Sequence, residues 1–143
     1  MGVLTNDLRA FLDAHPVGVL ATTAQNGRAR QSLVYFAPDG DRLLISTLAD
    51  RLKARDVRRT GWASVCVMGH EPPFPSATFS GAAVILTVNI AAPTSLIARR
   101  IAPTAVPPEP LTDEMLAAAG RVILAITIER VSAANHLQVS SER

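Results

Sequence analysis

The residues best suited to chemistry lie in the segment 43–59, which reads LLISTLADRLKARDVRR. Ser46 and Thr47 carry adjacent hydroxyls after a short apolar run, and Asp50 can cap a helix. Five basic residues follow within one helical length: Arg51, Lys53, Arg55, Arg58 and Arg59. Hydroxyls, the free amides and dipole at a helix start, and basic side chains all favour a bound anion. The segment therefore predicts a strand leading into a basic helix whose chemistry suits a phosphate group.

A basic helix is also the ordinary composition of a solvated surface, so this alternative stays open. Between residues 50 and 59 five positive charges face two negative ones, Asp50 and Asp56, which gives a local sum of +3. The chain has 14 basic residues, and its single lysine, Lys53, lies inside this candidate site. That placement favours the functional interpretation.

Composition limits the remaining function classes. The 143 residues fit one domain, 1–143, and 48% apolar with 18% charged residues is typical of a globular protein. The net charge of +2, with few and scattered aromatics, does not favour nucleic acid as a partner. Neither a signal peptide nor a membrane-spanning apolar run is apparent. A single cysteine, Cys66, fits a reducing cytoplasm, and the high apolar share suggests a buried subunit interface.

Apolar patterns and turn signals predict six strands, over residues 17–23, 28–36, 42–47, 62–68, 76–88 and 121–131. The first three are expected to pair consecutively, with turns at 25–27 and 38–41. Both faces of 62–68 are largely apolar, so this strand is expected to be buried on both sides. Helices that are inserted between strands rather than alternating with them indicate a mainly β fold, a small antiparallel barrel.

Four helices are expected among these strands. The first begins after Thr5 or Asn6 and ends at His15-Pro16, and the basic helix ends at Thr60-Gly61. A third covers 89–101, with its regular part starting at Pro93, and a short one covers 112–119. The proline-rich segment 102–110 is predicted to cross the surface, and the tail from Ser132 is polar.

Catalytic groups supplied by the protein itself are hard to find in this sequence. Three separated histidines and one cysteine do not form a metal-ligand cluster, and neither a GxSxG elbow nor a Gly-rich phosphate loop is present. Cys66 is expected to be a small buried side chain. His70 beside Glu71 could form an acid–base pair, although an ordinary loop histidine is favoured. This pattern indicates that a bound cofactor carries the chemistry.

The order of these features resembles a known superfamily. A hairpin at Asn26-Gly27-Arg28, a turn at Gly40-Asp41, the Ser46-Thr47 strand and the pattern Arg51-x-Lys53-x-Arg55-Asp56-x-Arg58-Arg59 are similar to the split-barrel flavin and deazaflavin oxidoreductases. This superfamily is named for pyridoxamine 5′-phosphate oxidase. The closing residues 128–131 resemble the last barrel strand of its actinobacterial members. Ala29 stands where many members have proline, and 60–62 replaces their Asp-Pro-Arg.

The resemblance implies a six-stranded antiparallel split β-barrel of the FMN-binding type that forms a homodimer with two cofactor sites at the subunit interface. It assigns the cofactor phosphate to Ser46, Thr47, Arg51 and Lys53, and places the second strand, around Ser32 to Val34, along the ring system. The basic pattern is most similar to the branch that uses the deazaflavin coenzyme F420. The arginine-rich C-terminal motif of the vitamin B6 oxidase is missing, which disfavours that activity.

The expected function is hydride transfer from reduced F420 to an unsaturated small organic acceptor, with the loop 69–75 contributing to the acceptor's site. Three alternatives remain open from the sequence. One is an FMN-dependent reductase or oxidase on the same barrel, and another is a non-catalytic flavin- or tetrapyrrole-binding protein. The third is an interaction module whose basic helix meets an acidic partner.

Overall fold

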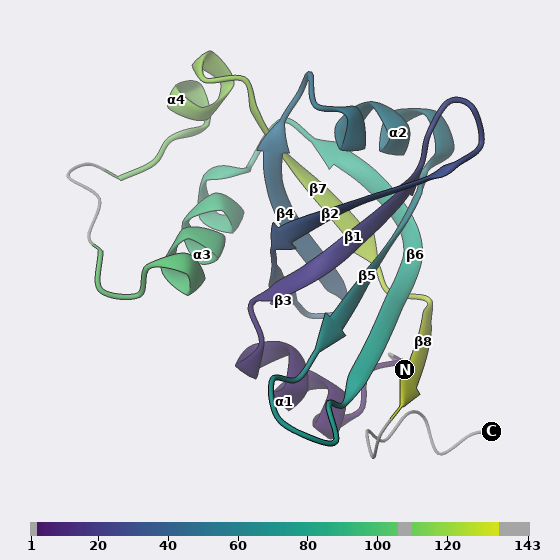
Figure 1. The fold of residues 1–143 in the computed structure, drawn as a ribbon. Helices are drawn as coiled ribbons and strands as arrows, with labels where there is room; N and C mark the ends of the chain where they lie inside the picture. Colours follow the sequence, from purple (N-terminus) through teal and green to yellow (C-terminus); the bar gives the residue numbers. More distant parts are fainter. Residues whose placement is uncertain (1–2, 106–109, 135–143) are drawn as a thin grey trace.

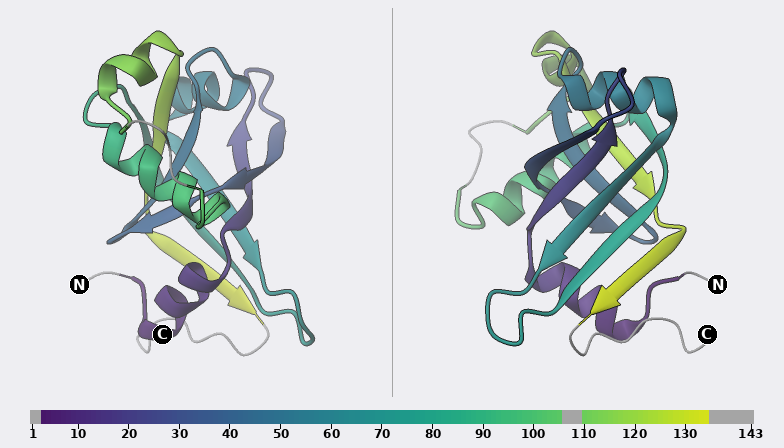
Figure 2. Two further views of the ribbon diagram at one scale, coloured as in Figure 1. Left: turned by 90° about the vertical axis from the view of Figure 1, so that its left-hand side faces the viewer. Right: turned by 45° about the vertical axis from the view of Figure 1, so that its right-hand side comes forward.

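The computed structural model describes residues 3–105 and 110–134, where a strongly curled antiparallel sheet is flanked by helices (Figures 1 and 2). The strands are β1 (Val17–Thr23), β2 (Ala29–Tyr35), β3 (Ala37–Asp39), β4 (Arg42–Leu48), β5 (Trp62–Met68), β6 (Ser76–Leu86), β7 (Arg121–Thr127) and β8 (Arg130–Ala134). The helices are α1 (Asn6–Ala14), α2 (Leu52–Thr60), α3 (Ala91–Ile101) and α4 (Asp113–Ala118). The predicted mainly β antiparallel barrel with inserted helices is confirmed.

Neighbouring strands follow the order β2-β1-β5-β6-β7-β4-β3, and β8 pairs with β6. Helices α1 and α2 lie at opposite ends of the half-barrel, whereas α3 and α4 lie against one side of it (Figure 1). Within the described residues, no helix combines the length and apolar character needed to cross a bilayer.

Local sequence signals account well for the first elements. The Thr5 hydroxyl accepts a hydrogen bond from the Leu8 amide at 3.2 Å and caps α1, which ends before Pro16 as predicted. The hairpin of β1 and β2 pairs Val17 with Tyr35 and continues in regular register to its turn. Gly27 occupies that turn with φ of 84°, a conformation that glycine adopts without strain.

Two apolar clusters fill the molecule. The larger lies inside the barrel and includes Leu43 and Ile45 of β4. The smaller lies on the other side of the same strand, where Leu44 packs with Ile97 of α3 and Leu116 of α4. Strand β4 is therefore buried on both faces, and the two helices cover the outer face of β4 and β7.

The predicted pairing of the third strand with the second is wrong. The structure pairs β4 with β7 along its whole length and with the short strand β3 on its other edge. Residues 38 and 39 accordingly belong to β3 rather than to a turn. Because β4 is apolar on both faces, it is best placed inside the sheet, between two neighbours and under a helix layer.

The predicted last strand, 121–131, divides into β7 and β8. The amide of Ile128 donates to the Asp41 carbonyl at 2.8 Å, and the amide of Glu129 donates to the Ser80 carbonyl at 2.9 Å. These bonds turn the chain, so that β8 leaves β4 and pairs with an earlier part of β6, the strand with which β7 also pairs. The tail is ordered as strand through Ala134. Its remainder, with residues 106–109 of the predicted surface crossing, lies outside the described residues.

Burial of β5 on both sides was also a wrong prediction. Ala63, Val65 and Val67 face the core, whereas Trp62, Cys66 and Met68 on the other face are exposed. Cys66 is therefore not the buried side chain that its apolar neighbours suggested. The reason is that no described helix covers this face of the sheet (Figure 2).

Helix starts differ from prediction at two places. Arg51 rather than Asp50 occupies the N-cap of α2, without a side-chain capping bond. Helix α3 begins at Ala91, two residues before Pro93, because the Asp113 carboxylate accepts hydrogen bonds from the amides at its start. Gly61 ends α2 with φ of 66°, as the Thr60-Gly61 signal predicted.

We expect Gly81→Ala to destabilise the barrel at the point where β7 gives way to β8. A Cβ built on Gly81 lies 1.8 Å from the Thr127 carbonyl oxygen, which is backbone and cannot rotate away. Overpacking of this kind costs about 3 kcal/mol or more. Urea unfolding measures the loss, with Ser80→Ala as the neighbouring control. A Gly81→Ala variant as stable as the wild type would contradict this account.

Candidate functional site

A cavity of about 480 Å³ opens between the sheet and the helices α3 and α4. Its walls come from β2, β4, α2, α3, the segment before α4, α4 itself and β7. The lining residues are Leu33, Val34, Tyr35, Ser46, Lys53, Thr94, Ile97, Ala98, Ile101, Leu111, Leu116 and Arg121. The volume falls within the range of small-molecule sites, and mostly apolar walls with few polar groups are typical of them.

The polar groups of the cavity are nearly all suited to an anion. Among the described residues that line it, Lys53 and Arg121 are the charged ones, and Ser46, Tyr35 and Thr94 contribute hydroxyls. Partial burial, and then the nearby charge of Arg51, lower the pKa of the Lys53 ammonium below its ordinary value. A bound anion would offset both effects. The cavity therefore favours a ligand that combines an apolar body with a negative group.

Strand register explains why Arg121 lies beside Ser46. Ser46 pairs with Ile123 across the β4–β7 ladder, and Arg121 is two residues from Ile123 on the same face. Diagonal neighbours of this kind are within reach of a long side chain. No local sequence signal indicates this arrangement, because Arg121 is 75 positions from Ser46 and the two residues meet only through the pairing of β4 with β7.

The six residues predicted to hold a cofactor are divided by the fold. Ser46, Lys53 and Val34 line the cavity. Thr47 is buried, with its side chain on the opposite face of β4 from Ser46. Arg51 caps α2 at the surface, and Ser32 lies further along β2 than the part that lines the cavity. Their ligand contacts stay predictions.

Two of the five basic residues of the motif have structural partners instead. Arg58 donates to the Ala49 carbonyl at 2.8 Å and so holds the turn before α2. Arg59 donates to the Thr23 carbonyl and lies 3.4 Å from an Asp56 carboxylate oxygen. These two guanidinium groups fix the helix against its neighbours. The basic residues of the motif therefore divide into two groups. Arg58 and Arg59 hold the helix in place, and Lys53 lines the cavity.

Asp113 ties together the two helices that wall the cavity. Its carboxylate oxygens accept hydrogen bonds from the amides of Asn89 at 2.6 Å, Ile90 at 2.9 Å and Ala91 at 3.0 Å. These bonds, with that from Asn89 the strongest influence, lower the pKa of Asp113. The first turn of α4 thus caps the start of α3 and holds the wall in place.

The proline-rich loop 69–75 does not line this cavity. It lies at the α1 end of the barrel, far from α2 (Figure 1). There His70 and Glu71 border a different cavity with His15, whose ring centroid lies 5.5 Å from that of His70. The expectation that this loop completes the acceptor's site is therefore not supported within one chain. In the described part of the chain, His, Cys, Asp and Glu residues form no group of three placed to hold a metal.

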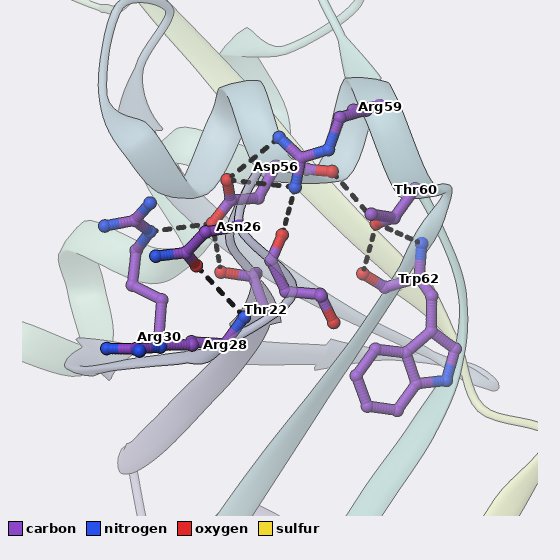
Figure 3. Close-up of polar contacts among 9 residues, drawn as sticks. Thr22, Asn26, Arg28, Arg30, Asp56, Arg59, Thr60 and Trp62 are labelled. Carbon is purple, nitrogen blue, oxygen red and sulfur yellow. Dashed lines mark hydrogen bonds and ion pairs between the residues drawn. The ribbon is translucent and has the colours of Figure 1, made fainter.

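A buried carboxylate, that of Asp56, lies on the side of the basic helix α2 that faces β1 and β2 (Figure 3). Asp56 is 2% exposed and accepts hydrogen bonds from Arg30 Nε at 2.7 Å and from the Thr22 hydroxyl at 2.8 Å. Burial by itself raises the pKa of Asp56, but the bonds from Arg30 and Thr22, the charge of Arg30 and the bond from Arg59 together lower it. The carboxylate is thus held ionised inside the protein, where it joins α2 to β1 and β2.

Comparisons with known proteins agree with this architecture. The model of the pyridoxamine 5′-phosphate oxidase family matches residues 4–135, so the chain belongs to that family. A search of curated proteins gave no significant match.

Three solved structures illustrate the shared fold. A conserved hypothetical protein, Rv2991 from Mycobacterium tuberculosis, is 20% identical with a TM-score of 0.75, covering 98% of this chain and 94% of that one. An F420 reductase is 23% identical with a TM-score of 0.69, covering 87% and 94%. A FAD-binding protein from Mesorhizobium loti is 22% identical with a TM-score of 0.68, covering 92% and 96%. Haem-binding proteins are also among the similar structures. At these identities the likeness shows the split-barrel fold alone.

Asp56→Asn is expected to lower the free energy of unfolding at pH 7 by about 2 kcal/mol, because it weakens charge-assisted bonds to a buried group. Since the pKa of Asp56 is lowered on folding, its stabilisation is complete above the unfolded value of about 4 and is lost as pH falls through the folded value. Urea unfolding of both proteins from pH 7 down to pH 3 measures this. A difference that does not shrink at acid pH would count against the assignment.

Proposed function

We propose that this protein is an oxidoreductase that binds reduced coenzyme F420 and supports hydride transfer to an unsaturated small organic acceptor. The observation that carries the proposal is the cavity in which Ser46, Lys53 and Arg121 meet an apolar wall, with no carboxylate among the described residues that line it. Family membership and the flavin- and F420-related structures support a cofactor of the flavin or deazaflavin type. The bound cofactor would supply the hydride chemistry.

The residues present fit such a group. An ammonium, a guanidinium and a hydroxyl are the donors that bind phosphate best. Leu33, Val34 and Tyr35 form a stretch of β2 on which a planar ring can pack, with Ile97 of α3 across the cavity. The protein's own contribution is to bind, orient and exclude water, which is a large part of catalysis by cofactor enzymes.

The cofactor class and the role of Lys53 are tested together by titration. Reduced and oxidised F420 and FMN are each added to the purified apoprotein, and binding is followed by fluorescence. Lys53→Ala should weaken binding about ten- to a hundred-fold, the value of one charge-assisted bond to phosphate. Arg55→Ala, an exposed cation of the same helix outside the cavity lining, is the matched control.

Preferential binding of FMN would replace F420 in this proposal and keep the enzyme class. Tight binding without turnover of any acceptor in a broad panel would indicate a carrier or storage protein instead. Equal affinity of Lys53→Ala and wild type would refute the assignment of the phosphate end. A salt-dependent complex with an acidic protein and no cofactor affinity would favour the interaction module.

We also propose that the protein is a cytoplasmic homodimer, and that the uncovered outer face of the sheet forms the interface. Leu33 is 75% exposed and Met68 53% exposed, although both are apolar. The pairing of Val19 with Leu33 and with Cys66 places these side chains on one continuous surface. Apolar surface of this extent on a small chain is typical of a subunit contact. Leu33 also lines the cavity, so the partner would lie close to the cofactor.

Sedimentation velocity tests this interface. The wild type is expected to sediment at twice its chain mass of 15.2 kDa, and Met68→Glu should shift it toward the monomer by placing a charge in the contact. Met115→Glu, the same substitution at an exposed methionine of α4, serves as the control. A monomeric wild type, or a dimer that tolerates Met68→Glu, would refute the proposed surface.

A further inference from the structure

The buried carboxylate of Asp56 connects two elements that line the cavity, α2 with its Lys53 ammonium and β2 with its apolar wall. It lies on α2, one helical turn after Lys53, and therefore on the element that supplies the cation. Its strongest partner, Arg30, lies on β2, four residues before Val34 and on the element that supplies the apolar wall. Among the described residues, the Arg30–Asp56 pair is the polar link between these two elements (Figure 3).

The geometry of this link is restrictive. The Arg30 Nε and the Thr22 hydroxyl both donate to the same carboxylate oxygen, at 2.7 and 2.8 Å. Arg59, three residues further along α2, approaches the other oxygen at 3.4 Å. Both oxygens are therefore held, and the side chain of Asp56 is only 2% exposed. A carboxylate bound in this way does not rotate freely, so it fixes where α2 lies along β1 and β2.

Stability alone is a weak explanation for such a site. Buried ion pairs are often no more stabilising than apolar residues of similar volume, because desolvation offsets their attraction. What a buried charge pair supplies is a defined geometry, since it is satisfied in few arrangements. Here the defined quantity is the separation between the β2 wall and the Lys53 ammonium.

We propose that Asp56 is a positioning residue that sets the distance between the ring-binding wall of β2 and the phosphate-binding end at Lys53. This inference rests on the proposed function, because it concerns a ligand that contacts both ends at once. Such a ligand gains affinity from two contacts held at matching distance, whereas a ligand that contacts one end does not depend on that distance. Asp56 touches neither ligand group itself and acts through the placement of Lys53.

The test compares ligands that reach one end or both. FMN carries ring and phosphate, riboflavin carries the ring without the phosphate, and inorganic phosphate occupies the other end. F420 and its phosphate-free deazaflavin core form a second such pair. Asp56→Asn should weaken FMN or F420 binding about ten-fold or more, because a misplacement of the order of an ångström can cost up to about a hundred-fold. Riboflavin, the deazaflavin core and inorganic phosphate should change less than about two-fold.

A second variant approaches the same pair from β2. Arg30→Gln should produce the same selective loss, and the double variant Asp56→Asn/Arg30→Gln should bind no more weakly than either single one, because both remove one interaction. Asp41→Asn, which alters an exposed carboxylate paired with Arg9, is the control. Circular dichroism identifies a temperature at which each variant is folded, and Arg30→Gln carries the test if Asp56→Asn does not fold.

The outcomes separate the two proposals. Weaker binding of FMN and F420 with unchanged binding of riboflavin, the deazaflavin core and inorganic phosphate supports the positioning role. An equal loss of affinity for riboflavin and FMN in Asp56→Asn or Arg30→Gln overturns it, and so does an unchanged affinity for FMN and F420. In both cases the proposed function stands as long as the wild type binds the cofactor. A wild type that binds neither F420 nor FMN overturns the proposed function and this inference with it.

Discussion

The pairing of β4 with β7 is the constraint on which the rest of the structure depends. The ladder runs from Arg42 opposite Thr127 to Leu48 opposite Arg121, and its residues alternate between two apolar clusters. One face closes the barrel interior, and the other receives α3 and α4. A shift by one residue would exchange these faces and mismatch the packing of both clusters, so the register is strongly specified. It also brings Ser46 and Arg121 to the same side, beneath the two helices.

Electrostatics in the basic segment follow from this packing. Arg58 and Arg59 donate to backbone carbonyls on neighbouring segments, so their charges serve the fold. Lys53 is left facing the cavity, and Arg121 joins it from a distant part of the chain. A cation available to a ligand is distinguished from one that holds a helix only by what its side chain contacts, the cavity or a backbone carbonyl. Counting charges along the sequence could not separate them.

The family assignment and the site address different questions. The pyridoxamine 5′-phosphate oxidase family establishes the barrel and a general relation to flavin-type cofactors. Similar barrels occur in an F420 reductase, a FAD-binding protein and haem-binding proteins, so the fold does not select one ligand. Selection must come from the side chains around the cavity. Among the described residues that line it, the cations Lys53 and Arg121, the hydroxyls and the apolar walls favour an anionic ligand with an apolar body.

Features that depend on residues close together in the chain can be predicted from the sequence. The Thr5 cap of α1, the β1–β2 hairpin with its Gly27 turn, and the stop of α2 at Gly61 were all predicted. Lys53 was singled out by composition and lies in the cavity. Each signal acts over a few positions, because caps, turns and alternation are set by local backbone geometry.

The tertiary structure alone decided which distant segments meet. The partner of β4, the division of the last strand and the exposure of Cys66 depend on packing that an apolar pattern does not specify. The contacts around the site are equally distant, with 26 positions between Arg30 and Asp56 and 24 between Asn89 and Asp113. Two positions so far apart carry no shared local signal. Their partnership arises only when the sheet register and the helix packing bring the donor within reach of the carboxylate.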